Sequence, residues 1–499
     1  MYKRQALHVT SEGAEQGVIK ADGRQLVIPQ GTKCVYYKAT VFSSEYPEYT
    51  GQSSEFDDVV TWGITGPTEE QTKGPHSYNV NSLHSQFEAG PFAGGNVVVA
   101  EGVLDYSIPA ASSASYLHLT GTAVNVSDGY LGSGVALQVA VLKVEIDKIV
   151  FNFDSTACTQ DGLNIRQDYT TAISVPEYVK GGQNRPAAYV KEKAVKIKVR
   201  LTVDPPTITS IKIKGVSDDT DGSLGDAAEQ SISFSGGVSY SGVADDPATT
   251  TINEAEFIEF TVNGNTPSTI HKSEDAWKWI VTEVNGAAVS DIQADRTSGH
   301  KIFTVLAAPT TAPWNQTAGD ACNAWAKALE LVCSSAWAGG QTTTSLAGTG
   351  IAQKLYTQAF YFGGTPHQRD GSGNLKLGIL LDTECAAPVN CEDVADMFTA
   401  LGNVLGCANV SVKLAADMDT NPVLPCPAAG MAWTNYASLS YHAISRGADG
   451  YFDSTYGFND IYLPYNIAAA LSLSDYLDLL IAPGATRPAV VSTWSPTIR

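Results

Sequence analysis

The spacing of apolar residues along this chain changes near residue 310, from every second residue before it to every third or fourth residue after it. The clearest part of the first pattern runs from Val195 to Val203, where apolar residues alternate with Lys, Arg and Thr. Such alternation buries one face of a β-strand and leaves the other in water. The later spacing indicates amphipathic helices. We therefore expect β-rich units followed by an α+β unit.

The chain has 499 residues, which is too long for one typical domain. We predict three: an all-β N-terminal region at 1–204, an immunoglobulin-like β-sandwich at 205–308 and an α+β domain at 314–499. The first boundary rests on the Asp204-Pro205-Pro206 segment, which interrupts a strand. The sandwich is expected because short strands alternate with Gly, Asp, Asn and Ser turns over this length.

The formal net charge of −21 disfavours binding to nucleic acid or to an anionic membrane, because both require a basic surface. No apolar run is long enough to span a membrane. The segment Met1 to His8 has two basic residues but no apolar run after them, so no signal peptide is expected. The β-rich composition suits a surface or extracellular protein, and the compartment stays open.

We predict neither a metal nor a cofactor. The eight cysteines include no Cys-x-x-Cys pair, and the acidic segment Asp218 to Gly222 lacks the spacing of an EF-hand loop. No glycine loop with the context of a phosphate site is present. Disulfides among the cysteines of the last 180 residues stay open, since spacing alone does not define their pairing.

The residues after Pro388 predict a helix of about four turns that begins at a cysteine. Its apolar stripe consists of Val394, Met397, Phe398, Leu401, Val404 and Leu405. Asn390 can cap this helix, which places Cys391 in its first turn, where unpaired backbone N–H groups stabilise a thiolate. Cys391 is therefore a candidate nucleophile. The adjacent Glu392 and Asp393 oppose thiolate formation, and a lone cysteine is more often a small buried apolar residue.

A predicted hairpin at residues 438–457 supplies a base and a group to orient it. A four-residue loop between Ser445 and Gly450 would place His442 directly opposite Asp453, with their Cβ atoms roughly 5 Å apart. A slip of one residue would put the two side chains on opposite faces.

Three short segments resemble the transglutaminase-like branch of the papain-type thiol enzymes. They are Asn390–Asp393, Tyr441–Ile444 and Tyr451–Thr455. The resemblance covers the predicted domain at 314–499 and implies an α+β fold and acyl transfer from a protein or peptide substrate. It implies that Cys391 attacks a carbonyl carbon, that His442 takes and returns the proton, and that Asp453 holds the imidazole tautomer. No residue matches the family's second oxyanion donor.

Two other functions stay open beside a cysteine peptidase or amidase. The first is a structural or adhesive β-protein whose last domain keeps a degenerate transglutaminase-like fold, and the missing oxyanion donor favours it. The second is ligand binding by the β modules, for which Trp277 and Trp279 are the one clue. The oligomeric state, and the choice between water and an amine as acyl acceptor, are left open.

Overall fold

The structure is a computed structural model, and before residue 144 it describes only the backbone of the strands. From residue 144 to 499 it describes backbone and side chains. The side chains not described in this range are those of residues 152–161, 164, 170–172, 174–175, 204–207, 219–223, 235–256, 287, 289–292, 316–322, 362–365, 416, 427–431, 437 and 459–468.

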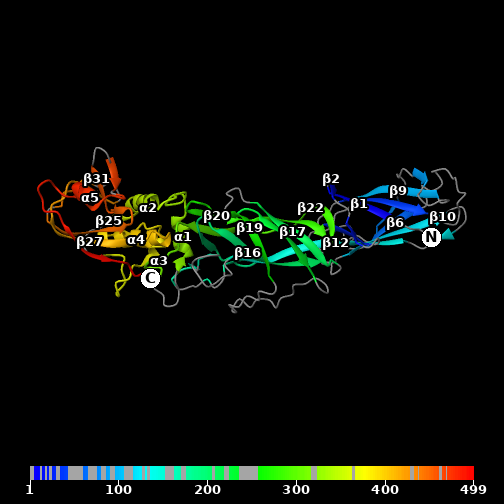
Figure 1. The fold of residues 1–499 in the computed structure, drawn as a ribbon, viewed down its shortest axis with the longest axis horizontal. Coiled ribbons are helices and arrows are strands. Elements are labelled where there is room, and N and C mark those ends of the chain that lie inside the picture. The colour runs from blue at the N-terminus through cyan, green and yellow to red at the C-terminus, as the bar shows by residue number, and fades with distance from the viewer. Residues whose placement is uncertain are drawn as a thin grey trace.

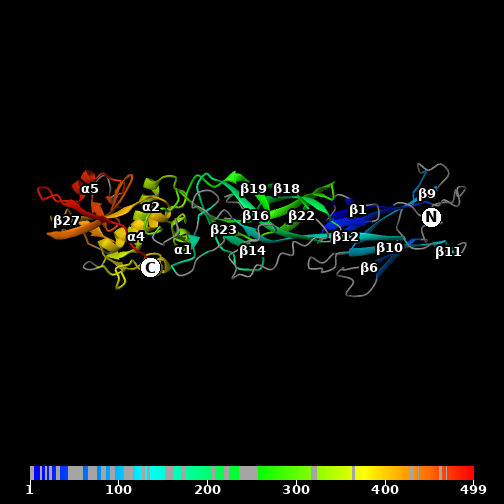
Figure 2. The same ribbon diagram turned by 60° about the horizontal axis from the view of Figure 1, so that its bottom comes forward.

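The described elements are arranged along one long axis, with the first strands at one end and the helices at the other (Figures 1 and 2). The first twelve strands are β1 Gln5–Ser11, β2 Ala14–Gln16, β3 Ile19–Ala21, β4 Gln25–Pro29, β5 Cys34–Phe42, β6 Val60–Thr65, β7 His76–Asn79, β8 Gln86–Ala89, β9 Asn96–Asp105, β10 Tyr116–Asn125, β11 Tyr130–Leu131 and β12 Val135–Val150. The long strand β12 continues from this region into the middle of the molecule, where it pairs with β16 (Ala194–Asp204).

The middle of the molecule is built on a curled antiparallel sheet. The strands of this middle region, besides β12 and β16, are β13 Ile165–Arg166, β14 Glu177–Val179, β15 Ala187–Val190, β17 Ser210–Ser217, β18 Ala227–Ser233, β19 Ile258–Asn265, β20 His271–Asp275, β21 Trp277–Val284, β22 Ala287–Arg296 and β23 His300–Val305. The main sheet runs in the order β22-β21-β17-β18-β19-β16-β12-β10-β6-β7, and β15, β23 and β20 form a second, smaller sheet.

The alternation between Val195 and Val203 is confirmed, since every apolar residue of this stretch is completely buried in β16. The core that contains them also contains Ile146 of β12 and Ile211 of β17. One core therefore extends across the predicted boundary after residue 204. The division of the chain into three domains and the immunoglobulin-like topology of 205–308 stay predictions.

Three side chains of the middle region answer questions left by the sequence. Trp277 and Trp279 are 1% and 0% exposed, so they are core residues and offer no ligand-binding surface. The hypothesis of ligand binding by the β modules thereby loses its one clue. Asp218, in the acidic segment, forms ion pairs with Lys278 and Arg296 instead of standing open to a cation.

The last part of the chain is an α+β region. Its elements are β24 Ala324–Trp325, α1 Ala326–Val332, α2 Thr344–Gln358, β25 Phe360–Tyr361, α3 Leu377–Asp382, β26 Pro388–Val389, α4 Cys391–Val404, β27 Val410–Met418, β28 Val423–Pro425, β29 Leu439–Gly447, β30 Gly450–Phe452, β31 Tyr456–Asn459, β32 Pro464–Ile467, α5 Leu473–Leu480 and β33 Ala489–Trp494. The amphipathic helices expected after residue 310 are present, among them α4, which begins at Cys391 as predicted. Among the described residues, no helix is long and apolar enough to cross a membrane.

Helix α4 lies at the centre of this region and is buried along nearly its whole length. It packs against β27 and β29 of the four-stranded sheet β30-β29-β27-β33 and against α1 and α2. The ring of Phe398 on α4 stacks on Phe452 of β30 at a centroid distance of 4.8 Å. This packing fixes the helix that begins with Cys391.

A glycine on α2 tests how tightly this core is packed. A Cβ atom at Gly348 would lie 2.7 Å from the ring of Phe452, whereas one at Gly378 on α3 would meet its nearest atom at 3.7 Å. We expect Gly348→Ala to lower the free energy of unfolding by ~1–3 kcal/mol through overpacking. Gly378→Ala is the control and should raise it by ~0.5–1 kcal/mol, because alanine favours a helix. Chemical denaturation measures both, and equal effects would contradict this description of the core.

Candidate functional site

Helix α4 begins as the sequence predicts, with Asn390 as its cap. The Asn390 side chain accepts a hydrogen bond from the backbone N–H of Asp393 (2.9 Å), and the Asp393 carboxylate accepts one from the backbone N–H of Asn390 (3.1 Å). This reciprocal arrangement is a capping box, which satisfies donors that a helix start leaves unpaired. Cys391 is therefore held as the first residue of a well-defined helix.

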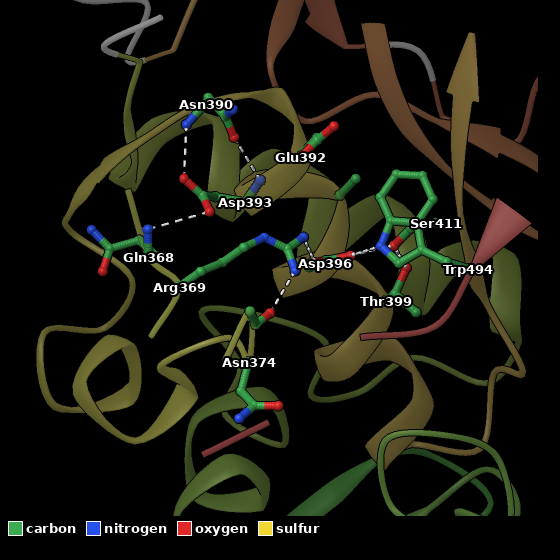
Figure 3. Close-up of polar contacts among 12 residues, drawn as sticks. Gln368, Arg369, Asn374, Asn390, Glu392, Asp393, Asp396, Thr399, Ser411 and Trp494 are labelled. Atoms are coloured by element: carbon green, nitrogen blue, oxygen red, sulfur yellow. Dashed lines mark hydrogen bonds and ion pairs between the residues drawn. The ribbon is translucent and has the colours of Figure 1, made fainter. Parts of the chain in front are cut away.

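The Asp393 carboxylate also holds a neighbouring segment against the helix start. It accepts hydrogen bonds from the backbone N–H groups of His367 (2.7 Å) and Gln368 (3.3 Å), as Figure 3 shows for Gln368. Burial raises the pKa of Asp393, and the three backbone donors act against that rise. The carboxylate is thus used to join the segment after residue 366 to α4.

The second acidic neighbour of the cysteine is also compensated. Glu392 accepts a hydrogen bond from the Lys413 ammonium of β27 at 3.0 Å. The same ammonium lies 3.9 Å from the centre of the Tyr441 ring, which is a cation–π distance. Both carboxylates that the sequence placed beside Cys391 therefore have partners of opposite charge or donor character. Their opposition to a thiolate is weaker than the sequence alone implies.

The structure brings His442 and Asp453 together, although through a different hairpin register. Nε2 of His442 lies 3.0 Å from Oδ2 of Asp453, and both side chains are completely buried. The four-residue loop is wrong, because Gly447 pairs with Gly450 around a two-residue turn. The shift is two residues, so both side chains stay on one face. Strand β30 ends at Phe452, and Asp453 lies just beyond the ladder.

Asp453 is held by three further donors that the sequence did not reveal. Its Oδ1 accepts hydrogen bonds from the backbone N–H groups of Thr455 (2.8 Å) and Tyr456 (3.3 Å). Its Oδ2 accepts one from the hydroxyl of Tyr476 on α5 (3.0 Å). The signal in the sequence was a tyrosine on the apolar stripe of α5, since a buried tyrosine hydroxyl usually has a polar partner.

Aromatic side chains fix the plane of the His442 ring. The ring stacks on Tyr456 at a centroid distance of 4.6 Å and an interplanar angle of 22°. The Tyr456 hydroxyl in turn donates to the Tyr361 hydroxyl at 3.1 Å. The imidazole therefore has one edge on a carboxylate and one face on an aromatic ring, so its orientation is set from two directions.

Cys391 lies beside this imidazole. Burial lowers the pKa of His442. The negative charge and hydrogen bond of Asp453, with the nearby Cys391 side chain and its charge, act in the opposite direction and raise this pKa to about 10. Nε2 of His442 is hydrogen-bonded to Asp453. Among the described residues, Nδ1 has no hydrogen-bond partner of good geometry. Nδ1 is therefore the ring nitrogen left for the thiol. The three residues predicted from the sequence meet at one place.

The other cysteines that the structure describes in the α+β region do not join this site. Cys333, Cys385, Cys407 and Cys426 are buried free thiols, and burial raises the pKa of each. Within the part of the chain that the structure describes, no three His, Cys, Asp or Glu side chains group as metal ligands.

Comparisons with known proteins give distant structural similarities. No family model matches the chain, and no curated protein matches it in sequence. A red sea bream transglutaminase structure is similar over 55% of this chain and 49% of its own, about half of that enzyme, with 11% identity and a TM-score of 0.31.

Two streptococcal domains are similar at lower TM-scores. The C-terminal domain of the Streptococcus agalactiae AgI/II polypeptide BspA matches over 58% of this chain and 99% of its own, with 10% identity and a TM-score of 0.22. The C-terminal domain of the Streptococcus pyogenes antigen I/II-family protein AspA matches over 61% of this chain and 100% of its own, with 11% identity and a TM-score of 0.20. Similarities this distant carry no argument about function.

The raised pKa of His442 predicts how stability depends on pH. An unfolded histidine titrates near ~6.5, so between that pH and about 10 the folded protein holds one proton more than the unfolded chain. The stability that His442 contributes is complete below the unfolded pKa. As pH rises through this range, the free energy of unfolding falls by at most ~1.4 kcal/mol per pH unit. Denaturation at pH 6–9 should show this slope in Cys391→Ala, where no thiol titration offsets the histidine, and a smaller slope in the double variant Cys391→Ala/His442→Gln. Identical slopes would contradict the pairing with Asp453.

Proposed function

We propose that this protein is a thiol-dependent acyl-transfer enzyme, with a transglutaminase-like domain at residues 314–499 that acts on a protein or peptide substrate. Cys391 is the nucleophile, His442 is the general base and acid, and Asp453 orients the imidazole. The observation that supports this most is the buried 3.0 Å contact between His442 and Asp453, next to a cysteine at the start of a helix.

The proposed reaction has two steps that regenerate the enzyme. The Cys391 thiolate attacks the carbonyl carbon of an amide, and the His442 imidazolium returns its proton to the leaving amine as the C–N bond breaks. This leaves a thioester on Cys391. Water or a second amine then attacks the thioester, gives its proton to His442, and releases the thiolate.

The elements around the site suit this chemistry. The capping box uses the backbone N–H groups of Asn390 and Asp393 but not those of Cys391 and Glu392. These first-turn donors and the positive end of the helix dipole would stabilise negative charge on the thiolate and on the developing oxyanion. Asp453 contacts one imidazole nitrogen and leaves the other for proton transfer, which is the division of roles in a catalytic triad. The second oxyanion donor stays unassigned.

One observation favours the structural or adhesive function as a second candidate. Cys391 is 7% exposed, while His442 and Asp453 are 0% exposed. A nucleophile must meet its substrate, so this burial suits a degenerate site that is kept for packing. The reactivity of Cys391 separates the two functions.

Alkylation across pH tests the assignment directly. In a thiolate–imidazolium pair, iodoacetamide should modify Cys391 quickly near pH 6, whereas in His442→Ala the reaction should be slow at that pH. Mass spectrometry identifies the modified cysteine. The four other buried cysteines serve as internal controls, because their raised pKa values keep them as unreactive thiols. An unchanged pH profile in His442→Ala would exclude the pair and favour the structural function.

A conservative substitution tests the role of Asp453. Asp453→Asn keeps the size of the side chain but no longer stabilises the imidazolium, so acylation of Cys391 by p-nitrophenyl acetate should slow by ~10²–10⁴. Asp417→Asn is the matched control, because Asp417 is an exposed acid on the neighbouring strand β27. Release of p-nitrophenol in the first turnover measures the rate. Equal rates in both variants would show that Asp453 has no orienting role.

A further inference from the structure

A side chain from strand β33 packs against the small buried cluster that contains Cys391. Cys391, Ala395 and Ala443 form a small buried cluster, and Tyr441 and Trp494 pack against it. Tyr441 is the neighbour of His442 on β29, but Trp494 comes from β33, about one hundred residues away from the cysteine in sequence. An aromatic side chain from a distant strand thus packs against the cluster that contains the proposed nucleophile.

The Trp494 indole is fixed by a hydrogen bond to a buried carboxylate. Its Nε1–H donates to Oδ1 of Asp396 at 2.8 Å, and the Ser411 hydroxyl donates to the same oxygen at 2.8 Å (Figure 3). Ser411 and Trp494 are directly paired in the ladder between β27 and β33. Their two donors therefore converge on Asp396 from one side of α4.

Asp396 connects this strand to the segment on the other side of the helix. Its side chain is completely buried, and its Oδ2 forms an ion pair with Arg369. Arg369 also donates to the carbonyl oxygen of Gly373 at 2.9 Å. A buried carboxylate is costly to desolvate, so it is stable only with its partners in place. The carboxylate in turn fixes the positions of those partners. The position of Trp494 is thereby set by α4, the same helix that carries Cys391.

The strand that carries Trp494 is paired with β27 along most of its length but has few inward side chains. Strand β33 lies at the edge of its sheet, and all of its residues are exposed except Val490 and Trp494, which are half-buried. Val491 is 54% exposed. Trp494 is therefore a main inward contact of an edge strand.

We propose that Trp494, held by Asp396, covers the Cys391 thiol and limits the width of the acyl donors that reach it. This inference names a specificity-determining residue of the proposed function and rests on it. With the indole packed against the cluster that contains the nucleophile, a slender group should pass it more readily than a broad one. The access of groups of different width to the Cys391 thiol can be measured with thiol reagents that need no acyl transfer.

Two maleimides with the same reactive group and different width test the proposal. N-methylmaleimide and N-(1-pyrenyl)maleimide are added to the full-length native protein, Trp494→Ala and Val491→Ala, and modification of Cys391 is followed by mass spectrometry. The quantity compared is the ratio of the pyrenyl rate to the methyl rate at Cys391. We expect Trp494→Ala to raise this ratio about tenfold, equivalent to ~1.4 kcal/mol. Val491→Ala changes the same strand at an exposed site and should leave the ratio unchanged.

Trp494→Phe gives a second readout and replaces Trp494→Ala if that variant does not fold. It keeps an aromatic ring but lacks the N–H that bonds Asp396, so its ratio should lie between those of the native protein and the alanine variant. The proposal is overturned if the ratio stays at the native value in the tryptophan variants, if Val491→Ala changes it equally, or if Cys391 reacts with neither reagent in any folded variant. The acyl-transfer function is tested separately, by the dependence of iodoacetamide alkylation on His442. The failure of that function and the failure of the Trp494 proposal are therefore distinguishable.

Discussion

The hydrogen bond between His442 and Asp453 is the interaction on which the rest of the site depends, because neither side chain contacts water. A buried carboxylate without partners would cost several kcal/mol, and a buried imidazolium would cost a similar amount. Together they stabilise each other, and the donors from Thr455, Tyr456 and Tyr476 satisfy the remaining carboxylate oxygen positions. The same arrangement raises the pKa of His442 and sets the ring orientation that the proposed acyl transfer needs.

Helix α4 connects this pair to the fold. Its cap at Asn390 fixes where Cys391 stands, and its buried carboxylates Asp393 and Asp396 join the segment around Arg369 and the strand of Trp494 to the same helix. Buried carboxylates rarely add stability relative to apolar residues of the same size. Their presence on the helix of the candidate nucleophile therefore suits positioning of the site better than packing of the core.

Local signals in the sequence predicted much of this arrangement. The cap and start of α4 follow from Pro388, Asn390 and the apolar stripe, and the strand at 195–203 follows from its alternation, because both depend on residues a few positions apart. The hairpin loop was predicted two residues too long, since Gly447 and Gly450 close a tighter turn than the flanking pattern suggests. Tyr476 and Trp494 were missed because only tertiary packing brings them to residues far away in the chain.

The protonation state of His442 at neutral pH tests the central claim most directly. Nitrogen NMR of the ring, assigned by comparison with His442→Gln, distinguishes imidazolium from either neutral tautomer. We predict that His442 is an imidazolium at pH 7–8 in the native protein, and that its titration moves to lower pH in Cys391→Ala because the thiol neighbour is lost. A neutral ring at pH 7, or a titration that does not change in Cys391→Ala, would contradict a coupled site formed by Cys391, His442 and Asp453.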